Sequence, residues 1–98
     1  MSILFKVVPP KKKLKEICTR LGPEYSIKMV DLEQVIYRRI NDNFDLEVSG
    51  LNNAKKSFDA TIFIWSLHPS VQIKEQVSGI KSFDELAAKL TAISQEYA

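Results

Sequence analysis

The sequence predicts an α+β protein with two layers, in which a mostly antiparallel sheet of about five or six strands has a helix near each end. Apolar residues recur with helical spacing near the beginning and at the end of the chain. Between these two segments, apolar and polar residues alternate in short runs that turn residues separate. The expected order is therefore β-α-β-β-β-β-β-α, and two helices on one sheet face are the usual way to close such a core.

The length and composition of the chain are those of one globular domain. The sequence has 98 residues, of which 45% are hydrophobic and 27% are charged. A chain of this length can bury a sufficient core without disulfides or a metal. We therefore expect a single domain over residues 1–98.

The first two elements lie on either side of two prolines. Residues 3–8 are rich in β-forming side chains and stop at Pro9 and Pro10, which predicts a short strand. From Lys11 the spacing becomes helical, with an apolar stripe made of Leu14, Ile17, Cys18 and Leu21. Gly22 followed by Pro23 is a helix stop, with a left-handed cap expected at the glycine.

The next segments predict a strand and a hairpin. Residues 25–30 alternate as a strand. Residues 32–40 could form either a helix or a strand, and their β-branched and aromatic side chains favour the strand. The run Asn41-Asp42-Asn43 is typical of a turn, since these side chains bond their own backbone. A hairpin is therefore expected between residues 34–40 and 44–48.

The last three elements begin with the strongest strand, residues 58–67, which is apolar on both faces. Ala60, Ile62 and Ile64 lie on one face, whereas the other carries Thr61, Phe63, Trp65 and Leu67. A further antiparallel strand is expected over residues 71–79. Ser82 and Glu85 then form a capping box for a final amphipathic helix, whose stripe contains Phe83, Leu86, Ala87, Leu90 and Ile93.

Several chemistries are disfavoured by the residues present. The three glycines stand far apart, which excludes a glycine-rich phosphate loop, and one cysteine and one histidine cannot build a soft metal site. Cys18 is expected in the core and His68 in a turn beside Pro69. Asp42, Asp45 and Glu47 are expected on a solvated hairpin face, where catalytic carboxylates are rare. We therefore expect no catalytic residue, no metal and no cofactor, and an enzyme is the least favoured class.

The charges favour one alternative function. The net charge is +2, but residues 1–30 carry seven Lys and Arg against two acids, whereas the remainder carries seven against ten. Basic side chains that cover the polar side of the first helix are Lys11, Lys12, Lys13, Lys15 and Arg20. They predict either an accessory nucleic-acid-binding surface or an ordinary solvated helix face, since few aromatic residues accompany them.

The aromatic residues favour the main functional hypothesis. Phe63 and Trp65 share one strand face, and Tyr37 and Arg39 share one face of their own strand. Two short helices would cover a single side of the sheet, and aromatic and arginine side chains are enriched at interfaces. The sequence therefore favours a non-catalytic protein-interaction domain, with a second copy or another protein as partner.

The expected location is the cytoplasm, with no membrane partner. The apolar run in residues 1–8 is too short for a secretory signal, and its lysines follow it instead of preceding it. The run at residues 60–67 falls well short of the roughly 20 residues that span a bilayer. A single cysteine allows no intrachain disulfide.

Overall fold

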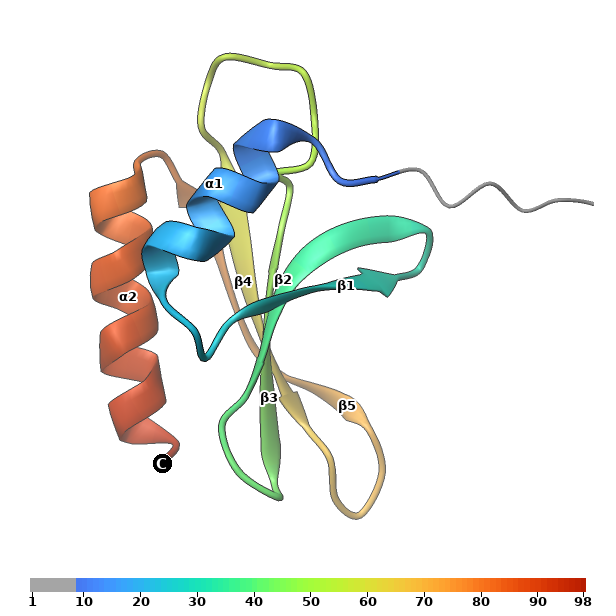
Figure 1. Cartoon of the computed structure of the whole chain (residues 1–98). Coiled ribbons are helices and arrows are strands. Elements are labelled where there is room, and N and C mark those ends of the chain that lie inside the picture. The colour runs from blue at the N-terminus through green and yellow to red at the C-terminus, as the bar shows by residue number, and fades with distance from the viewer. Residues whose placement is uncertain (1–8) are drawn as a thin grey trace, which may run out of the picture.

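The computed structural model describes residues 9–98 and confirms the predicted α+β class, with a five-stranded antiparallel sheet and a helix at each end of the described chain (Figure 1). The elements in chain order are α1 (Lys12–Leu21), β1 (Ser26–Val30), β2 (Glu33–Arg39), β3 (Phe44–Ser49), β4 (Ala60–Ser66), β5 (Gln72–Ile80) and α2 (Phe83–Glu96). The strands lie in the sheet in their chain order, β1-β2-β3-β4-β5. The strand expected at residues 3–8 lies outside the described residues.

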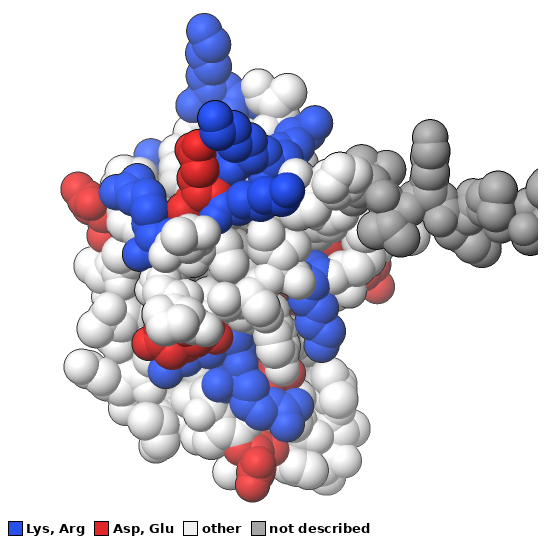
Figure 2. Space-filling view, in the orientation of Figure 1, with Lys and Arg blue, Asp and Glu red and all other residues white. Residues whose placement is uncertain are grey.

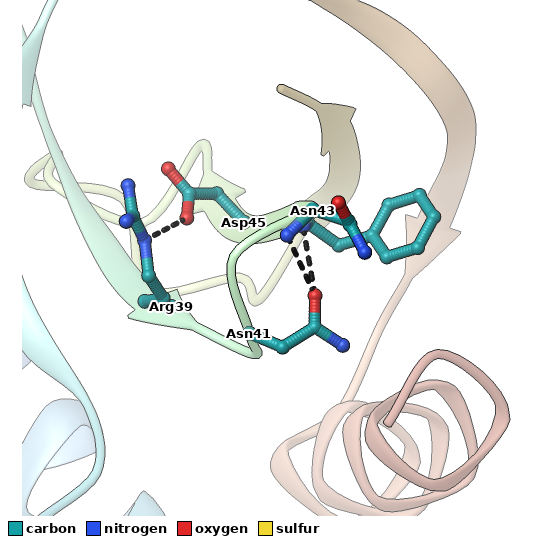
Figure 3. Close-up of polar contacts among 5 residues, drawn as sticks. Arg39, Asn41, Asn43 and Asp45 are labelled. Atoms are coloured by element: carbon teal, nitrogen blue, oxygen red, sulfur yellow. Dashed lines mark hydrogen bonds and ion pairs between the residues drawn. The ribbon is translucent and has the colours of Figure 1, made fainter. Parts of the chain in front are cut away.

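The segment with the ambiguous pattern is a strand, and the predicted hairpin forms between β2 and β3. These strands pair antiparallel, with Ile36 opposite Val48 and Arg39 opposite Asp45. Asn41 fixes the turn, because its Oδ1 accepts the backbone N–H groups of Asn43 and Phe44 at 2.8 and 3.1 Å (Figure 3). The side chain thus satisfies two backbone donors at the point where the chain reverses.

Both helices lie on the same face of the sheet, where their apolar stripes form one core with the strands (Figure 1). The buried residues of this cluster come from both helices, from β2 to β5 and from the loop after β3: Leu14, Ile17, Cys18, Ile36, Leu46, Val48, Leu51, Ala60, Ile62, Ile64, Ile80, Leu86, Leu90 and Ile93. The alternation within β4 decides its orientation, since Ile62 and Ile64 are fully buried while Phe63 and Trp65 are half-buried on the opposite face.

The end of α1 differs in detail from the expected left-handed cap. Gly22 has φ 122° and ψ 171°, so its φ is positive but its ψ is extended. Its N–H donates to the carbonyl of Thr19 at 3.3 Å, which caps the helix directly after Leu21. Only glycine adopts this backbone conformation without a steric cost. The expected cap residue is correct, and the expected cap geometry is wrong.

The capping box of α2 forms with one changed partner. Ser82 Oγ accepts the backbone N–H of Glu85 at 3.1 Å, as predicted. The carboxylate of Glu85, however, accepts the N–H of Lys81 at 2.9 Å instead of the N–H of Ser82. The first turn of the helix is still capped from both directions, since the acid reaches one residue further back along the chain.

The C-terminal end of α2 is fixed to the sheet by Tyr97. Its ring packs edge-on against Phe44 with 4.8 Å between centroids, and its hydroxyl donates to Glu75 Oε1 at 2.7 Å. That hydrogen bond raises the pKa of Tyr97 to about 12, because the carboxylate stabilises the protonated phenol. Asn41 adds a contact from the hairpin turn, donating to the Tyr97 carbonyl at 2.7 Å.

Two irregularities in β5 explain its imperfect alternation. The register between β4 and β5 shifts between Ala60 and Ile62, near Gly79 with its φ of 73°, and again between Ile64 and Trp65. Because each shift adds one residue to β5, Val77 lies opposite Ile62 on the helix-covered face, whereas Ile73 lies opposite Trp65 on the other face. The second shift therefore brings an isoleucine beside the tryptophan.

Within residues 9–98, neither helix has the length and apolar character needed to cross a bilayer.

Candidate functional site

The face of the sheet that the helices leave uncovered, here called the open face, carries the predicted aromatic residues. The strand registers place Tyr37, Glu47, Phe63 and Gln76 in one row across β2 to β5. The next row contains Arg39, Asp45, Trp65 and Ile73. The structure thus brings all four predicted interface residues, Phe63, Trp65, Tyr37 and Arg39, onto one surface.

Trp65 and Glu47 form the centre of this face. The indole Nε1–H of Trp65 donates to Glu47 Oε1 at 3.0 Å, from the neighbouring strand. The Phe63 and Trp65 ring centroids lie 6.5 Å apart, with the rings tilted by 35°. A buried indole N–H requires an acceptor, and here a carboxylate provides it. This hydrogen bond holds the indole against β3 and leaves the remainder of the ring at the surface.

A second polar group lies beside the first and involves the β2–β3 hairpin. Arg39 Nε donates to Asp45 Oδ1 at 3.0 Å, and the two side chains face each other across the strands (Figure 3). Burial, together with a hydrogen bond to Asp45, raises the pKa of Tyr37. The Lys28 ammonium from β1 lies 4.3 Å from the centroid of the Tyr37 ring, within the range of a cation–π contact.

Most of these residues, but not Phe63 or Arg39, line a pocket of about 290 Å³, here called the acidic pocket. Its lining comes from every strand or the loops beside them: Lys28, Val30, Asp31, Tyr37, Asp45, Glu47, Trp65, Leu67 and Val71. Asp31 lies in the β1–β2 turn and Val71 just before β5, at opposite ends of the strand order. The open face is therefore concave, and its pocket is at the lower limit of the size that small-molecule sites have.

The two carboxylates of β3 are buried, so the prediction of a solvated hairpin face was wrong for Asp45 and Glu47. They are 9% and 8% exposed, because the neighbouring side chains of β2 and β4 stand beside them on the concave face. Asp45 is neutralised by Arg39. Glu47 forms no ion pair with any residue in the described part of the chain, and burial raises its pKa despite the bond from Trp65.

The raised pKa of Glu47 sets the direction of a pH effect. The Glu47 carboxylate binds a proton more tightly in the folded protein than in the unfolded chain. The free energy of unfolding therefore falls as the pH rises above 4.5, the ordinary pKa of a glutamate side chain. Glu47→Gln keeps an acceptor for Trp65 and removes the buried charge. We expect this variant to gain roughly 0.5–2 kcal/mol of unfolding free energy at neutral pH. Urea unfolding between pH 4.5 and neutrality measures it, and the gain should shrink towards the acid end.

The matched control for this substitution is Asp42→Asn in the exposed hairpin turn. It removes the same charge without changing a buried group, so its effect on stability should stay within about 0.5 kcal/mol. An equal gain from both variants, or a loss from Glu47→Gln, would show that Glu47 is not a destabilising buried charge.

An apolar border surrounds the polar centre of the open face. Val71 is 67% exposed and Ile73 is 48% exposed, and Ile73 is the cross-strand neighbour of Trp65. Leu67 and Val30 are half-buried at the same pocket. Aromatic residues, an isolated carboxylate and exposed aliphatic side chains therefore meet on one concave surface, a combination typical of binding sites.

The basic residues of the alternative hypothesis lie elsewhere, on and beside α1. Lys11, Lys12 and Lys15 are exposed there, and Figure 2 shows lysine and arginine side chains gathered over this helix. Lys13 instead donates to Asn53 Oδ1 and to the Lys55 carbonyl, both at 2.9 Å, which ties α1 to the loop after β3. Arg20 stacks on Phe83 of α2 with 3.7 Å between its Cζ and the ring centroid. Nucleic-acid binding by this surface stays a prediction.

The remaining candidates have structural positions. Cys18 is buried in α1, and burial raises the pKa of its thiol, which is unfavourable for a nucleophile. His68 is exposed in the β4–β5 turn, where its peptide bond to Pro69 is cis. Among residues 9–98, no three His, Cys, Asp or Glu side chains come together as a metal site requires.

Comparison with known proteins adds no relative: no family model, no curated protein and no solved structure matches the chain.

Proposed function

We propose that this chain is a non-catalytic protein-interaction domain whose open face binds a partner segment that combines a basic side chain with apolar neighbours. The single observation that carries the proposal is the acidic pocket, which is lined by the hydrogen-bonded pair Glu47 and Trp65 on the sheet face opposite the helix-covered core. The proposal assigns the whole surface to a protein partner, because its size and mixed chemistry suit side chains.

The charge of the pocket determines the kind of partner. Asp45 is paired with Arg39, so Lys28 alone faces the two other carboxylates, Glu47 and Asp31. The pocket therefore has more negative than positive side chains. A carboxylate beside an indole favours binding of a cation, because the carboxylate attracts it by charge and the indole ring by a cation–π interaction. A lysine or arginine side chain provides both a cationic head and an apolar stem for the border around Val71.

The same charge argues against a second copy as the occupant of this face. In a two-fold symmetric dimer, each patch meets the same patch of the other subunit. Two acidic pockets would then lie close together, and like charges across an interface oppose association. The second copy is therefore the less favoured partner, and the experiment distinguishes it. The single buried thiol of Cys18 is suited to a reducing compartment, and we place the interaction in the cytoplasm.

The test is a titration with short soluble peptides that contain one lysine between two leucines. We expect saturable shifts of the Trp65 indole N–H and of backbone amides in β3 and β4, followed by nuclear magnetic resonance. Replacing the lysine by norleucine keeps the stem and removes the charge, and it should weaken binding about tenfold. Glu47→Gln should weaken binding of the lysine peptide by a similar factor while leaving the norleucine peptide unchanged.

Three results would contradict the proposal. Equal binding of the lysine and norleucine peptides would show that the pocket does not select a cation. The absence of shifts on the open face with either peptide would remove the surface as a binding site. A dimer in light scattering that protects the Trp65 indole from a solvent quencher would assign this face to a second copy.

A further inference from the structure

A second groove of the molecule lies between the two helices, on the side of the sheet opposite the acidic pocket. Its volume is about 350 Å³. The end of α1, the loop after it, β2 and α2 together provide its lining: Arg20, Leu21, Glu24, Tyr25, Arg38, Phe83, Ala87, Leu90, Thr91, Ser94 and Gln95. We call it the interhelix groove, and Figure 1 shows α1 beside α2 where it forms.

Arg38 is the unusual residue of this groove. It lies in the same cross-strand row as Leu46 and Ile64, on the face of the sheet that the helices cover. Its side chain is half-buried there, and its one hydrogen bond within the described chain donates to Ser94 Oγ at 3.2 Å. A guanidinium has five N–H donors and a full charge, so a single hydrogen bond to Ser94 leaves most of its donors available to a ligand.

Arg20 approaches the same groove from α1. Its guanidinium stacks on Phe83, and that of Arg38 lies 5.5 Å from the centroid of the Tyr25 ring. Aromatic rings hold both planar groups in place without neutralising them. Neither arginine forms an ion pair with an acid among residues 9–98. The groove thus contains two guanidinium groups that pack on aromatic rings and form no ion pair within residues 9–98.

The other lining residues fit a small organic anion. Ser94 and Gln95 lie on one side of α2 and offer a hydroxyl and an amide donor, whereas the Thr91 hydroxyl already donates to the Ala87 carbonyl at 3.0 Å. Leu90 and Ala87 add an apolar wall beside them. One acid, Glu24, also lines the groove, and its carboxylate is folded over Gly22, where an added Cβ would meet Glu24 Oε1 at 2.5 Å.

We infer that the interhelix groove is a binding site for a small phosphate monoester, held by the guanidinium groups of Arg20 and Arg38. Two arginine forks match the charge and the oxygen geometry of a phosphate dianion better than those of a single carboxylate. The apolar wall accepts the small organic group that the phosphate carries. This site is separate from the acidic pocket and has the opposite charge, so it does not depend on the proposed protein partner.

The experiment titrates the full chain at constant ionic strength with inorganic phosphate, phenyl phosphate and succinate. The Nε–H resonances of Arg20 and Arg38 should shift saturably with both phosphates, with phenyl phosphate binding in the range of about 1 mM or tighter. Binding should strengthen as the pH rises through about 6, because the monoester then becomes a dianion. Chloride at the same ionic strength should give no saturable shift.

Matched variants separate a site from general positive charge. Arg38→Gln should weaken phenyl phosphate binding about tenfold or more, and Arg38→Lys should also weaken it because the fork is lost while the charge stays. Lys56→Gln is the control, since it removes one positive charge from the exposed loop after β3, outside the groove. Arg20→Gln on the exposed side of α1 repeats the test if replacement of Arg38 disturbs folding.

The inference is overturned by any of three results: no saturable shift with either phosphate, equal weakening by Lys56→Gln and Arg38→Gln, or tighter binding of succinate than of phenyl phosphate. All three concern the interhelix groove alone. They leave the outcome of the lysine-peptide titration on the open face unchanged.

Discussion

Ile62→Ala is expected to lower the free energy of unfolding by about 2–5 kcal/mol. Ile62 is fully buried in the middle of β4, with Val48 and Val77 as its cross-strand neighbours and the two helices above. Truncation removes three carbon atoms and leaves a cavity. The surrounding strands cannot move to fill it, because backbone hydrogen bonds to their neighbours hold them in place. Urea unfolding followed by circular dichroism measures the loss.

The neighbouring residue provides the control. Phe63 is larger than Ile62 but half-buried on the open face, where no helix packs against it. Phe63→Ala should therefore cost only about 1–2 kcal/mol, because part of the ring surface is already in contact with water. Equal losses at the two positions would mean that the open face is as much a core as the helix-covered face, and the proposed interaction surface would no longer have a basis.

The sequence predicted the elements well wherever a local rule decides them. The alternation of Ala60, Ile62 and Ile64 with aromatic residues identified β4 and its two faces, since a strand reverses side at every residue. The turn at Asn41 and the cap at Ser82 depend on hydrogen bonds between residues two or three apart, so the local sequence was sufficient to predict both. For the same reason, the open face could be anticipated from Phe63 and Trp65.

Features that depend on contacts between distant strands could not be predicted in this way. Asp45 and Glu47 were expected in solvent, because alternation gives the side of a strand but not what stands beside it. Their burial follows from the register that places them opposite Trp65 and Phe63 on β4. The indole N–H of Trp65 was the available signal, since a half-buried tryptophan needs an acceptor on an adjacent strand.

The concave shape of the open face is a second feature of this kind. It brings the turn residue Asp31 to the same pocket as Val71, although the strands beside them are at opposite edges of the sheet. Shifts of register, such as the two in β5, increase local twist, and their positions depend on pairing energies that the sequence of one strand does not contain. The interhelix groove likewise combines residues from α1, β2 and α2, so Arg38 could not be recognised as its central cation.

The open face retains groups that make the isolated domain less stable. Glu47 is a buried carboxylate that forms no ion pair in the described chain, and Val71 and Ile73 expose aliphatic surface on the same face. A fully apolar pocket bottom would stabilise the fold more. Such a local cost is typical of functional sites, where stability is lower than the sequence could provide. A bound cation would lower the pKa of Glu47 and offset the cost of burying its charge.

Trp65→Phe is the substitution expected to affect binding most. It removes the indole N–H, which positions Glu47 in the pocket, but retains an aromatic ring. The variant deletes the Nε1–H that donates to Glu47 Oε1 at 3.0 Å. Losing a hydrogen bond to a charged, buried acceptor costs about 1.5–3 kcal/mol. The pKa of Glu47 should rise further, since that bond lowers it in the native protein. Titration of the Glu47 carboxyl carbon by nuclear magnetic resonance measures this shift.

The consequence for binding follows from the same bond. A more strongly protonated and less well positioned Glu47 attracts a cation less, and the smaller ring covers less of its apolar stem. We expect Trp65→Phe to weaken the lysine peptide about 30-fold, corresponding to a contribution of about 2 kcal/mol. The norleucine peptide should lose less, because it makes no contact that depends on the carboxylate. If the variant bound the lysine peptide with native affinity and left the pKa of Glu47 unchanged, the pair of Trp65 and Glu47 would be a structural contact only, and the cation-binding role proposed for it would be wrong.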